Sequence, residues 1–140
     1  MKILVAVDGS PYTKHMLAYL AAHEQWLAGT NEFTVLHVVP AVPPRAAAAL
    51  DRDVVKAYYE DESEKVFKPI RTFLKKNGVE AACVSKVGHA ADHIAALADK
   101  GKFDLLIMGS HGHGALGNLV MGSVATKVLA NSKTPVLLVR

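Results

Sequence analysis

Closely spaced glycines after an apolar segment are the residues of this sequence whose spacing most clearly suggests chemistry. Gly109 is followed by two residues and then by Gly112, and nine more residues lead to the pair Gly122-Ser123. Glycines let backbone N–H groups approach an anion without a Cβ in the way. Ser123 stands before a helical pattern, where an anion would also meet the positive end of a helix dipole. The spacing fits a phosphate cradle, and it equally fits a glycine-rich loop that ends in an ordinary N-cap serine.

Histidines near these glycines raise the alternative of a metal site. His111 and His113 flank Gly112, and His89 and His93 stand four residues apart in a preceding helical pattern. A zinc site needs three or four convergent ligands. Neither a nearby cysteine nor an HExxH motif supports one, so we expect surface or loop histidines and no metal held by side chains. The lysine of a P-loop and a GxGxxG after the first apolar run are also missing.

Asp8 ends the first apolar run and precedes Gly9, Ser10 and Pro11. A carboxylate in this place could accept a hydrogen bond from a ribose hydroxyl or hold Mg²⁺ through water. Alternatively, Asp8 or Ser10 would cap a helix whose first turn contains Pro11. Both interpretations remain open at this point.

Five short apolar runs separated by helical patterns predict the elements that must position these residues. The runs are Ile3–Val7, Phe33–Val39, Ala81–Val87, Phe103–Met108 and Pro135–Val139, and the helical patterns are Thr13–Leu27, Asp51–Asn77, Ala90–Asp99 and Val124–Asn131. We expect Pro69 to kink or split its helix and the proline-rich Pro40–Leu50 to be extended. The alternation predicts an α/β fold, an open parallel sheet with helices on both faces. Ligands of such sheets bind at the carboxyl ends of strands, where the strand order reverses.

Composition bounds the protein class. The 140 residues predict one domain, 1–140, and 51% hydrophobic with 21% charged residues is typical of a globular protein. No apolar run approaches the roughly 20 residues of a membrane span, and the N-terminus does not resemble a signal peptide. The single cysteine, Cys83, predicts a core residue and a reducing, cytoplasmic location. A net charge of +3 without a basic stripe argues against nucleic acid as a partner.

Four segments together resemble the universal stress protein family. They are "ILVAVDGS" at the start, "LHVV" in the second run, "DLLIMGSHGHGALGNLVMGSVATKVL" and the closing "TPVLLVR". The resemblance covers nearly the whole chain, and the G-x2-G-x9-G-S spacing marks the single-domain, UspA-like, ATP-binding branch. It implies a Rossmann-like sheet of five strands in the order 3-2-1-4-5, similar to the adenine nucleotide alpha hydrolases.

The resemblance also implies a set of nucleotide-binding residues. These are Val7, Asp8, Val38, Gly109, Ser110, His111, Gly112, His113, Gly122, Ser123 and Val124. Asp8 would approach the ribose or the metal-bound phosphates, and the backbone at Val38 would recognise adenine. Mg²⁺ or Mn²⁺ would arrive with ATP, held mainly by phosphates and water. The family often has arginine or lysine where this chain has His113, and a neutral imidazole is a poorer phosphate partner.

The family resemblance further implies a homodimer that pairs through the last strand, Pro135–Val139. The function expected is that of an ATP-binding stress or regulatory protein with slow or no hydrolysis, since the glycine segment carries no lysine. One alternative is a weak ATPase, or a protein that phosphorylates itself on Ser10, Ser110 or Ser123. Another is a dimeric interaction module that binds no nucleotide.

Overall fold

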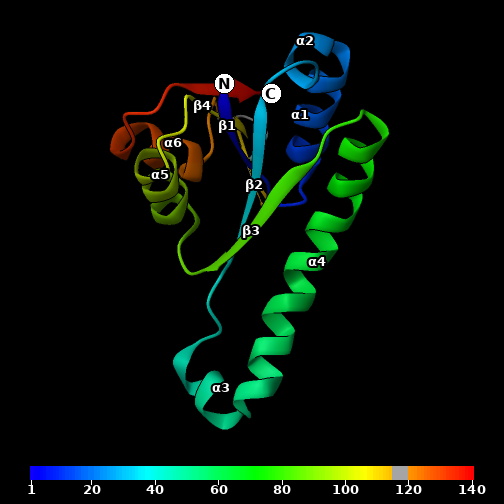
Figure 1. The fold of residues 1–140 in the computed structure, drawn as a ribbon. Coiled ribbons are helices and arrows are strands. Elements are labelled where there is room, and N and C mark those ends of the chain that lie inside the picture. The colour runs from blue at the N-terminus through cyan, green and yellow to red at the C-terminus, as the bar shows by residue number, and fades with distance from the viewer. Residues whose placement is uncertain (115–119) are drawn as a thin grey trace.

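The computed structural model describes residues 1–114 and 120–140 and contains one parallel sheet of five strands. The strands are β1 (Lys2–Ala6), β2 (Glu32–Val39), β3 (Ala81–Val87), β4 (Leu105–Gly109) and β5 (Val136–Val139). Their order is β3-β2-β1-β4-β5, and every neighbouring pair is parallel (Figure 1). The predicted α/β class and strand order are confirmed.

Helices cover both faces of the sheet (Figure 1). On one face lie α1 (Pro11–Ala22) and α4 (Arg52–Lys76), and on the other lie α5 (Ala90–Lys100) and α6 (Ser123–Asn131). In β1 and the residue that follows it, Ile3, Val5 and Val7 pack toward α1 and α4, whereas Leu4 and Ala6 pack toward α5 and α6. A strand covered on both sides needs apolar residues at every position, which explains the unbroken apolar run at the start of the chain.

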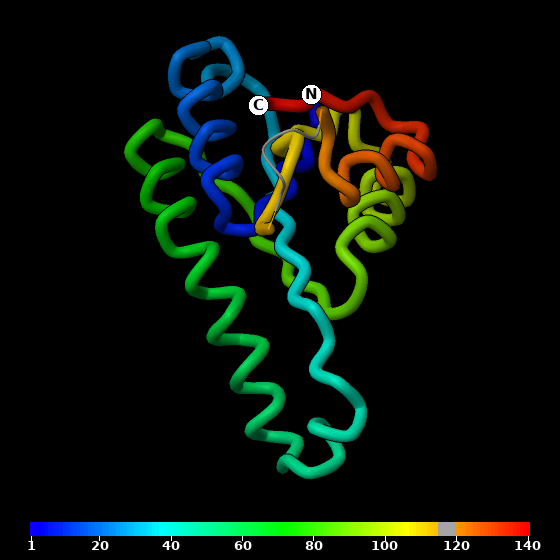
Figure 2. Tube along the Cα trace, turned by 180° about the vertical axis from the view of Figure 1, so that it is seen from behind, coloured from blue at the N-terminus to red at the C-terminus, as the bar shows by residue number. Residues whose placement is uncertain are grey.

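The site is placed by the divergence of the chain after β1 and β4. These strands are neighbours, but β1 leads into α1 on one face and β4 leads toward α6 on the other. Connections that leave in opposite directions open a crevice between them at the carboxyl ends of the strands. Figure 2 shows the β1–α1 loop and the first residues after β4 side by side at this edge.

Pro69 does not split its helix, because α4 runs without interruption from Arg52 to Lys76. Pro69 is exposed, so the carbonyl that loses its helical partner faces water, and Phe67 and Ile70 hold both flanks against the sheet. None of the described helices has the length and apolar character that crossing a membrane requires.

The helix predicted over Thr13–Leu27 begins at Pro11 and is broken at His23 into α1 and α2 (Glu24–Leu27). The His23 ring stacks on Tyr19 and its Nδ1 lies 2.8 Å from the Tyr19 carbonyl oxygen. That carbonyl is the acceptor a continuing helix would give to the His23 N–H, so the side chain competes with the helix.

Residues 40–50 are not extended throughout, since they contain the short helix α3 (Pro44–Ala49). Pro44 fits the first helical position, and the four alanines that follow Arg45 have the highest helix propensity.

The two edges of the sheet are β3 and β5. Cys83 in β3 is only partly buried, so the prediction of a core cysteine is correct only in part. In β5, Val136, Leu137 and Leu138 are also half-buried, and β4 is the strand with which β5 pairs among the described residues. An edge of this kind leaves backbone groups available for a further strand.

Candidate functional site

A cavity of about 360 Å³ lies at the carboxyl ends of β1, β2 and β4. This volume is within the range of about 300 to 1,000 Å³ typical of small-molecule sites. It is lined by Ala6, Val7, Asp8, Thr13, Leu36, Val38, Ala90, Ile94, Met108, Gly109, His111, Gly112, His113, Gly114, Gly122, Ser123, Val124 and Ala125.

Ten of the eleven residues predicted for the site line this cavity. The exception is Ser110, which is 3% exposed and whose hydroxyl lies 2.8 Å from Nδ1 of His111. The lining also contains residues that the sequence did not single out, chiefly Thr13 from α1 and Ile94 from α5. Only their positions could have indicated them: Thr13 lies in the first turn of the helix after Asp8, and Ile94 lies on the apolar face of α5.

Asp8 has one oxygen fixed by the chain and one directed at the glycine turn. Its Oδ1 accepts hydrogen bonds from the Ser10 N–H at 2.9 Å and the Thr13 hydroxyl at 3.0 Å. A Cβ built on Gly112 would lie 2.6 Å from Oδ2, and Oδ2 makes no hydrogen bond with another described residue. Asp8 therefore both holds the turn before α1 and presents a carboxylate oxygen to the cavity.

The capping roles predicted for two serines are wrong in detail. Ser10 occupies the N-cap position of α1, but its hydroxyl makes no capping hydrogen bond and is buried without a partner among the described residues. Helix α6 begins at Ser123, and Gly122 is its N-cap. The Ser123 side chain is exposed at the first helical position, where an N-terminal N–H group lacks a helical acceptor.

Two of the glycines allow the chain to pack against itself. A Cβ on Gly109 would lie 2.8 Å from Cβ of Tyr12, and one on Gly122 would lie 3.1 Å from Cα of His111. The Gly122 N–H donates to the Ser110 carbonyl at 2.7 Å, which closes this contact. Packing of the chain therefore explains why Gly109 and Gly122 lack a side chain, whether or not a ligand binds. At Gly112 the missing Cβ leaves room for the Asp8 carboxylate.

The backbone at the end of β2 has groups without a strand partner. The Leu36 carbonyl accepts from the Val7 N–H at 2.9 Å, so Leu36 faces β1. Residues two apart in a strand direct their backbone groups to the same side. Val38 therefore directs its N–H and C=O past the end of β1, where no described residue pairs with them.

Val7 cannot offer backbone groups in the same way. Its N–H donates to Leu36, and its carbonyl accepts from the ring Nδ1–H of the buried His37 at 2.8 Å. Val7 is thus left with van der Waals contact at the cavity wall.

The histidines after β4 tie the two loops together. His113 Nε2 lies 2.8 Å from the Asp8 carbonyl oxygen, and because a carbonyl only accepts, Nε2 carries the proton. The His111 ring packs 4.8 Å from the ring of Tyr12. Among the described residues, no three His, Cys, Asp or Glu side chains converge to hold a metal ion. His93, considered above as a ligand, pairs instead with the Val87 carbonyl at 3.0 Å.

The cavity has an apolar half and a polar half. Leu36, Ile94 and Met108 belong to the buried core of the sheet, whereas Asp8 and Ser123 bring oxygen atoms. No lysine or arginine is present in its described lining. Such a cavity can hold a flat apolar ring against β2 and α5 while the polar end of the same ligand faces the glycine turn and the α6 N-terminus.

Comparison with known proteins gives one consistent family. The family model described as the universal stress protein family matches residues 1–140. A universal stress protein of Thermus aquaticus is 33% identical over 138 residues, which is 99% of this chain and 97% of the relative. The solved structure of the protein MJ0577, known from Methanocaldococcus jannaschii, has a TM-score of 0.83 at 26% identity and covers 99% of this chain and 94% of its own.

Three further solved structures are described with a nucleotide. A universal stress protein in complex with cAMP has a TM-score of 0.71 at 23% identity, covering 100% of this chain and 97% of its own. The universal stress protein of Archaeoglobus fulgidus in complex with dAMP has a TM-score of 0.69 at 22% identity and covers 100% of this chain and 98% of its own. The Arabidopsis thaliana protein with AMP bound has a TM-score of 0.70 at 15% identity and covers 99% of this chain and 90% of its own. At these identities the likeness shows the shared fold.

Proposed function

The chain belongs to the universal stress protein family, and from this premise we propose that its cavity binds an adenine nucleotide, namely ATP with Mg²⁺ or Mn²⁺. One observation carries the proposal: the backbone of Val38, with which no described residue pairs, and the Oδ2 atom of Asp8 face the same cavity. Adenine presents a donor next to an acceptor, which matches the N–H and C=O of one extended residue. The cAMP, dAMP and AMP of the solved family structures support the choice of adenine.

The polar half of the cavity suits the ribose and the phosphates. Asp8 Oδ2 is an acceptor for ribose hydroxyls or a ligand for a hard cation. The phosphates would lie at Gly112 and at the N-terminus of α6, where Ser123 adds a hydroxyl donor. Mg²⁺ is commonly held by one or two carboxylates together with phosphates and water, and a single carboxylate, Asp8, lines the described cavity.

We further propose that the nucleotide sets a regulatory state and is hydrolysed slowly or not at all. Fast phosphoryl transfer relies on positive side chains or metals that stabilise the developing charge. The described lining contains no lysine or arginine, and the sequence of residues 115–119 contains none either. A homodimer through β5 and a cytoplasmic location remain predictions that accompany this proposal.

The first experiment is to denature the purified, undialysed protein with heat and acid and to chromatograph what it releases. We expect adenine nucleotide near one equivalent per chain. Adding Mg-ATP to the emptied protein should raise its melting temperature more than Mg-GTP, because guanine presents a different donor and acceptor pattern.

A matched pair of variants separates the site from general effects of charge. Asp8→Asn should weaken Mg-ATP binding about tenfold, since it removes the charge that faces the cation. Asp92→Asn, on the exposed side of α5, should bind as the wild type does. An empty extract together with no thermal shift would contradict the proposal and favour the interaction module.

A further inference from the structure

Residues 40–62 form an arm that projects beyond the carboxyl edge of the sheet (Figure 1). The arm comprises α3 and the first part of α4, and not one of its residues is buried. The buried residues of α4 begin at Ser63, where the helix reaches the sheet. Yet the arm carries large apolar side chains, and Leu50, Val54 and Tyr58 are 48%, 53% and 46% exposed. These three side chains do not line the groove of the arm, which has apolar residues of its own.

A groove runs between the two helices of the arm. It has a volume of about 490 Å³ and is lined by Ala47, Ala48, Arg52, Val55, Lys56 and Tyr59. The two sides are joined where the Tyr59 hydroxyl accepts a hydrogen bond from the Val42 N–H at 2.8 Å. The groove is therefore preformed, and a ligand would not have to order it on binding.

The groove lining is positively charged, whereas most charged residues on the rest of the arm are acidic. Arg52 and Lys56 stand one helical turn apart along the groove, and no acidic residue lines it. The Lys56 ammonium lies 3.9 Å from Glu60, and both side chains are largely exposed, which makes this a weak ion pair. The remaining charged residues of the arm lie outside the groove lining; they are Asp51, Asp53, Glu60, Asp61 and Glu62, together with one cation, Arg45. An apolar floor beside two cations fits an apolar ligand that carries negative charge.

We propose that this groove binds an acidic amphipathic segment of another protein. Apolar side chains of the segment would cover Ala48, Val55 and Tyr59, and its Asp or Glu side chains would pair with Arg52 and Lys56. This is the geometry of helix-in-groove recognition, with charges that set orientation and partner choice.

Other occupants fit the charges less well. An anionic membrane or a nucleic acid would cover more of the arm and would be repelled by Asp53 and Asp61. A second copy of this chain placed groove to groove would set two linings against each other, each with Arg52 and Lys56 and no acidic residue, so the two positive linings would repel. An acidic peptide confined to the groove avoids both repulsions.

The test uses the full-length protein and a phage-displayed library of random 16-residue peptides, followed by fluorescence anisotropy with the enriched peptides. We expect enriched peptides that combine several Asp or Glu residues with apolar residues at helical spacing. Arg52→Glu with Lys56→Glu should weaken their binding about tenfold or more. Both side chains are exposed, and a Glu at the start of α4 is favourable for the helix, so the variant should fold.

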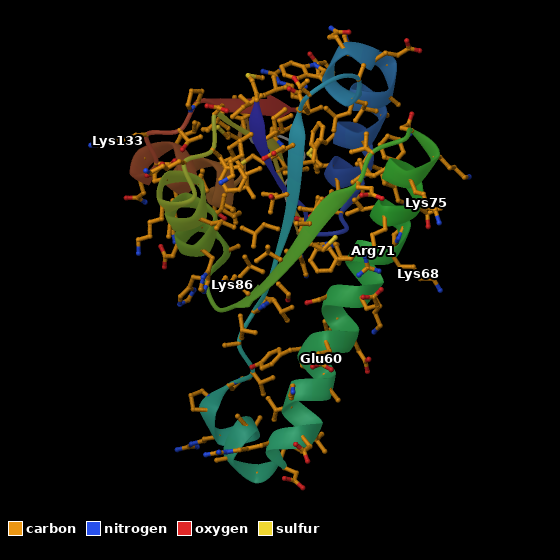
Figure 3. The ribbon with its side chains drawn as sticks, in the orientation of Figure 1. Glu60, Lys68, Arg71, Lys75, Lys86 and Lys133 are labelled. Atoms are coloured by element: carbon orange, nitrogen blue, oxygen red, sulfur yellow. The ribbon has the colours of Figure 1, made fainter. Side chains whose placement is uncertain are left out.

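Two matched controls are available on the same helix. Lys75→Glu with Lys76→Glu changes the net charge equally at the opposite end of α4, where Figure 3 labels Lys75, and should leave binding unchanged. Tyr59→Phe removes the hydrogen bond that joins the groove and should weaken binding, whereas the adjacent Tyr58→Phe should not.

Four outcomes would overturn the proposal. They are the absence of any enriched peptide, enrichment of basic peptides, equal binding by the two double variants, and binding to phosphatidylserine vesicles but to no peptide.

Discussion

The hydroxyl oxygen of Thr13 lies 3.0 Å from Oδ1 of Asp8 and 3.2 Å from the Asp8 backbone nitrogen, so one side chain holds both the carboxylate and its peptide. Thr13 is 5% exposed and lines the cavity. With Oδ1 occupied by Thr13 and by the Ser10 N–H, the orientation of Oδ2 toward Gly112 is fixed. Thr13 thus positions the atom that we propose contacts the nucleotide.

Thr13→Val should weaken Mg-ATP binding about tenfold, because valine keeps the volume but loses a hydrogen bond to a charged group. Thr13→Ser keeps the hydroxyl and should retain most of the affinity at a small cost in packing. Isothermal titration of both variants measures the difference. Equal affinities for the valine and serine variants would mean that Thr13 only fills space.

Gly112→Ala tests whether Oδ2 of Asp8 contacts the ligand. The new Cβ would lie 2.6 Å from Oδ2, so the carboxylate must rotate away from its present position. Moving the carboxylate away from the ligand should reduce nucleotide affinity about tenfold or more. The same substitution combined with Asp8→Asn should have little further effect, since both changes remove one interaction.

Gly78→Ala, which follows α4 and lies outside the cavity lining, is the control for that substitution. A Cβ there would meet nothing within 4 Å, but its φ of +72° is strained for alanine. It should lower the free energy of unfolding by about 1 to 2 kcal/mol and leave the affinity nearly intact. If the Gly112→Ala variant binds the nucleotide with wild-type affinity, Oδ2 of Asp8 does not contact the ligand.

The proposed homodimer can be tested through the alternation of β5. The Pro135 and Val139 carbonyls accept hydrogen bonds from the N–H groups of Leu106 and Ser110. Val136 and Leu138 therefore direct their backbone groups away from β4, to the free edge. Leu138→Pro removes one outward N–H without breaking the ladder with β4, and proline is tolerated on an edge in that orientation. We expect this variant to be a monomer by light scattering.

Leu138→Ala provides the comparison for lost packing. Leu138 packs against the core on the α5 and α6 face, and alanine removes that packing while it keeps the edge N–H. We expect the alanine variant to be less stable but still dimeric. Monomers in both variants would attribute the dimer to the leucine side chain, and dimers in both would place the interface elsewhere.

The sequence predicted the strands and the residues at their carboxyl ends because a doubly covered parallel sheet leaves an unbroken apolar run that ends at a polar residue or a glycine. Asp8 and Gly109 both stand at such ends. The alternation of strands and helices predicted a parallel sheet, but it left the strand order open. The order came from the family resemblance, and it is the order that brings Asp8 beside Gly112.

The remaining features depend on contacts between distant segments. Thr13 reads in sequence as an ordinary residue of a first helical turn, and its role follows from the fold of the loop before it. Gly109 and Gly122 belong to the spacing that predicted a phosphate cradle, yet a Cβ at either position would also approach a neighbouring part of the chain closely. The helical pattern of α4 was visible, but the pattern does not tell where the sheet ends beneath it. The arm and its groove therefore could not be predicted.

Asp99 should make the free energy of unfolding depend on pH in the acidic range. Hydrogen bonds from the Ser132 and Thr134 hydroxyls, at 2.7 and 2.8 Å, hold the pKa of the Asp99 carboxyl below its ordinary value of 3.8. The backbone N–H groups of Lys133 and Thr134 add to this effect and fix the turn between α6 and β5. The unfolded chain therefore binds a proton at a higher pH than the folded chain does. The stabilisation is present above pH 3.8 and is lost as the pH falls through the lowered pKa.

Urea unfolding of the wild type and of Asp99→Asn between pH 7 and pH 2.5 measures this contribution. The wild type should have the larger free energy of unfolding at pH 7. The difference between the two proteins should shrink as the pH falls below 3.8, because the protonated Asp99 carboxyl no longer accepts hydrogen bonds as a charged group. If the difference in the free energy of unfolding between the wild type and Asp99→Asn stays constant over this range, the charge of the Asp99 carboxylate does not stabilise the turn.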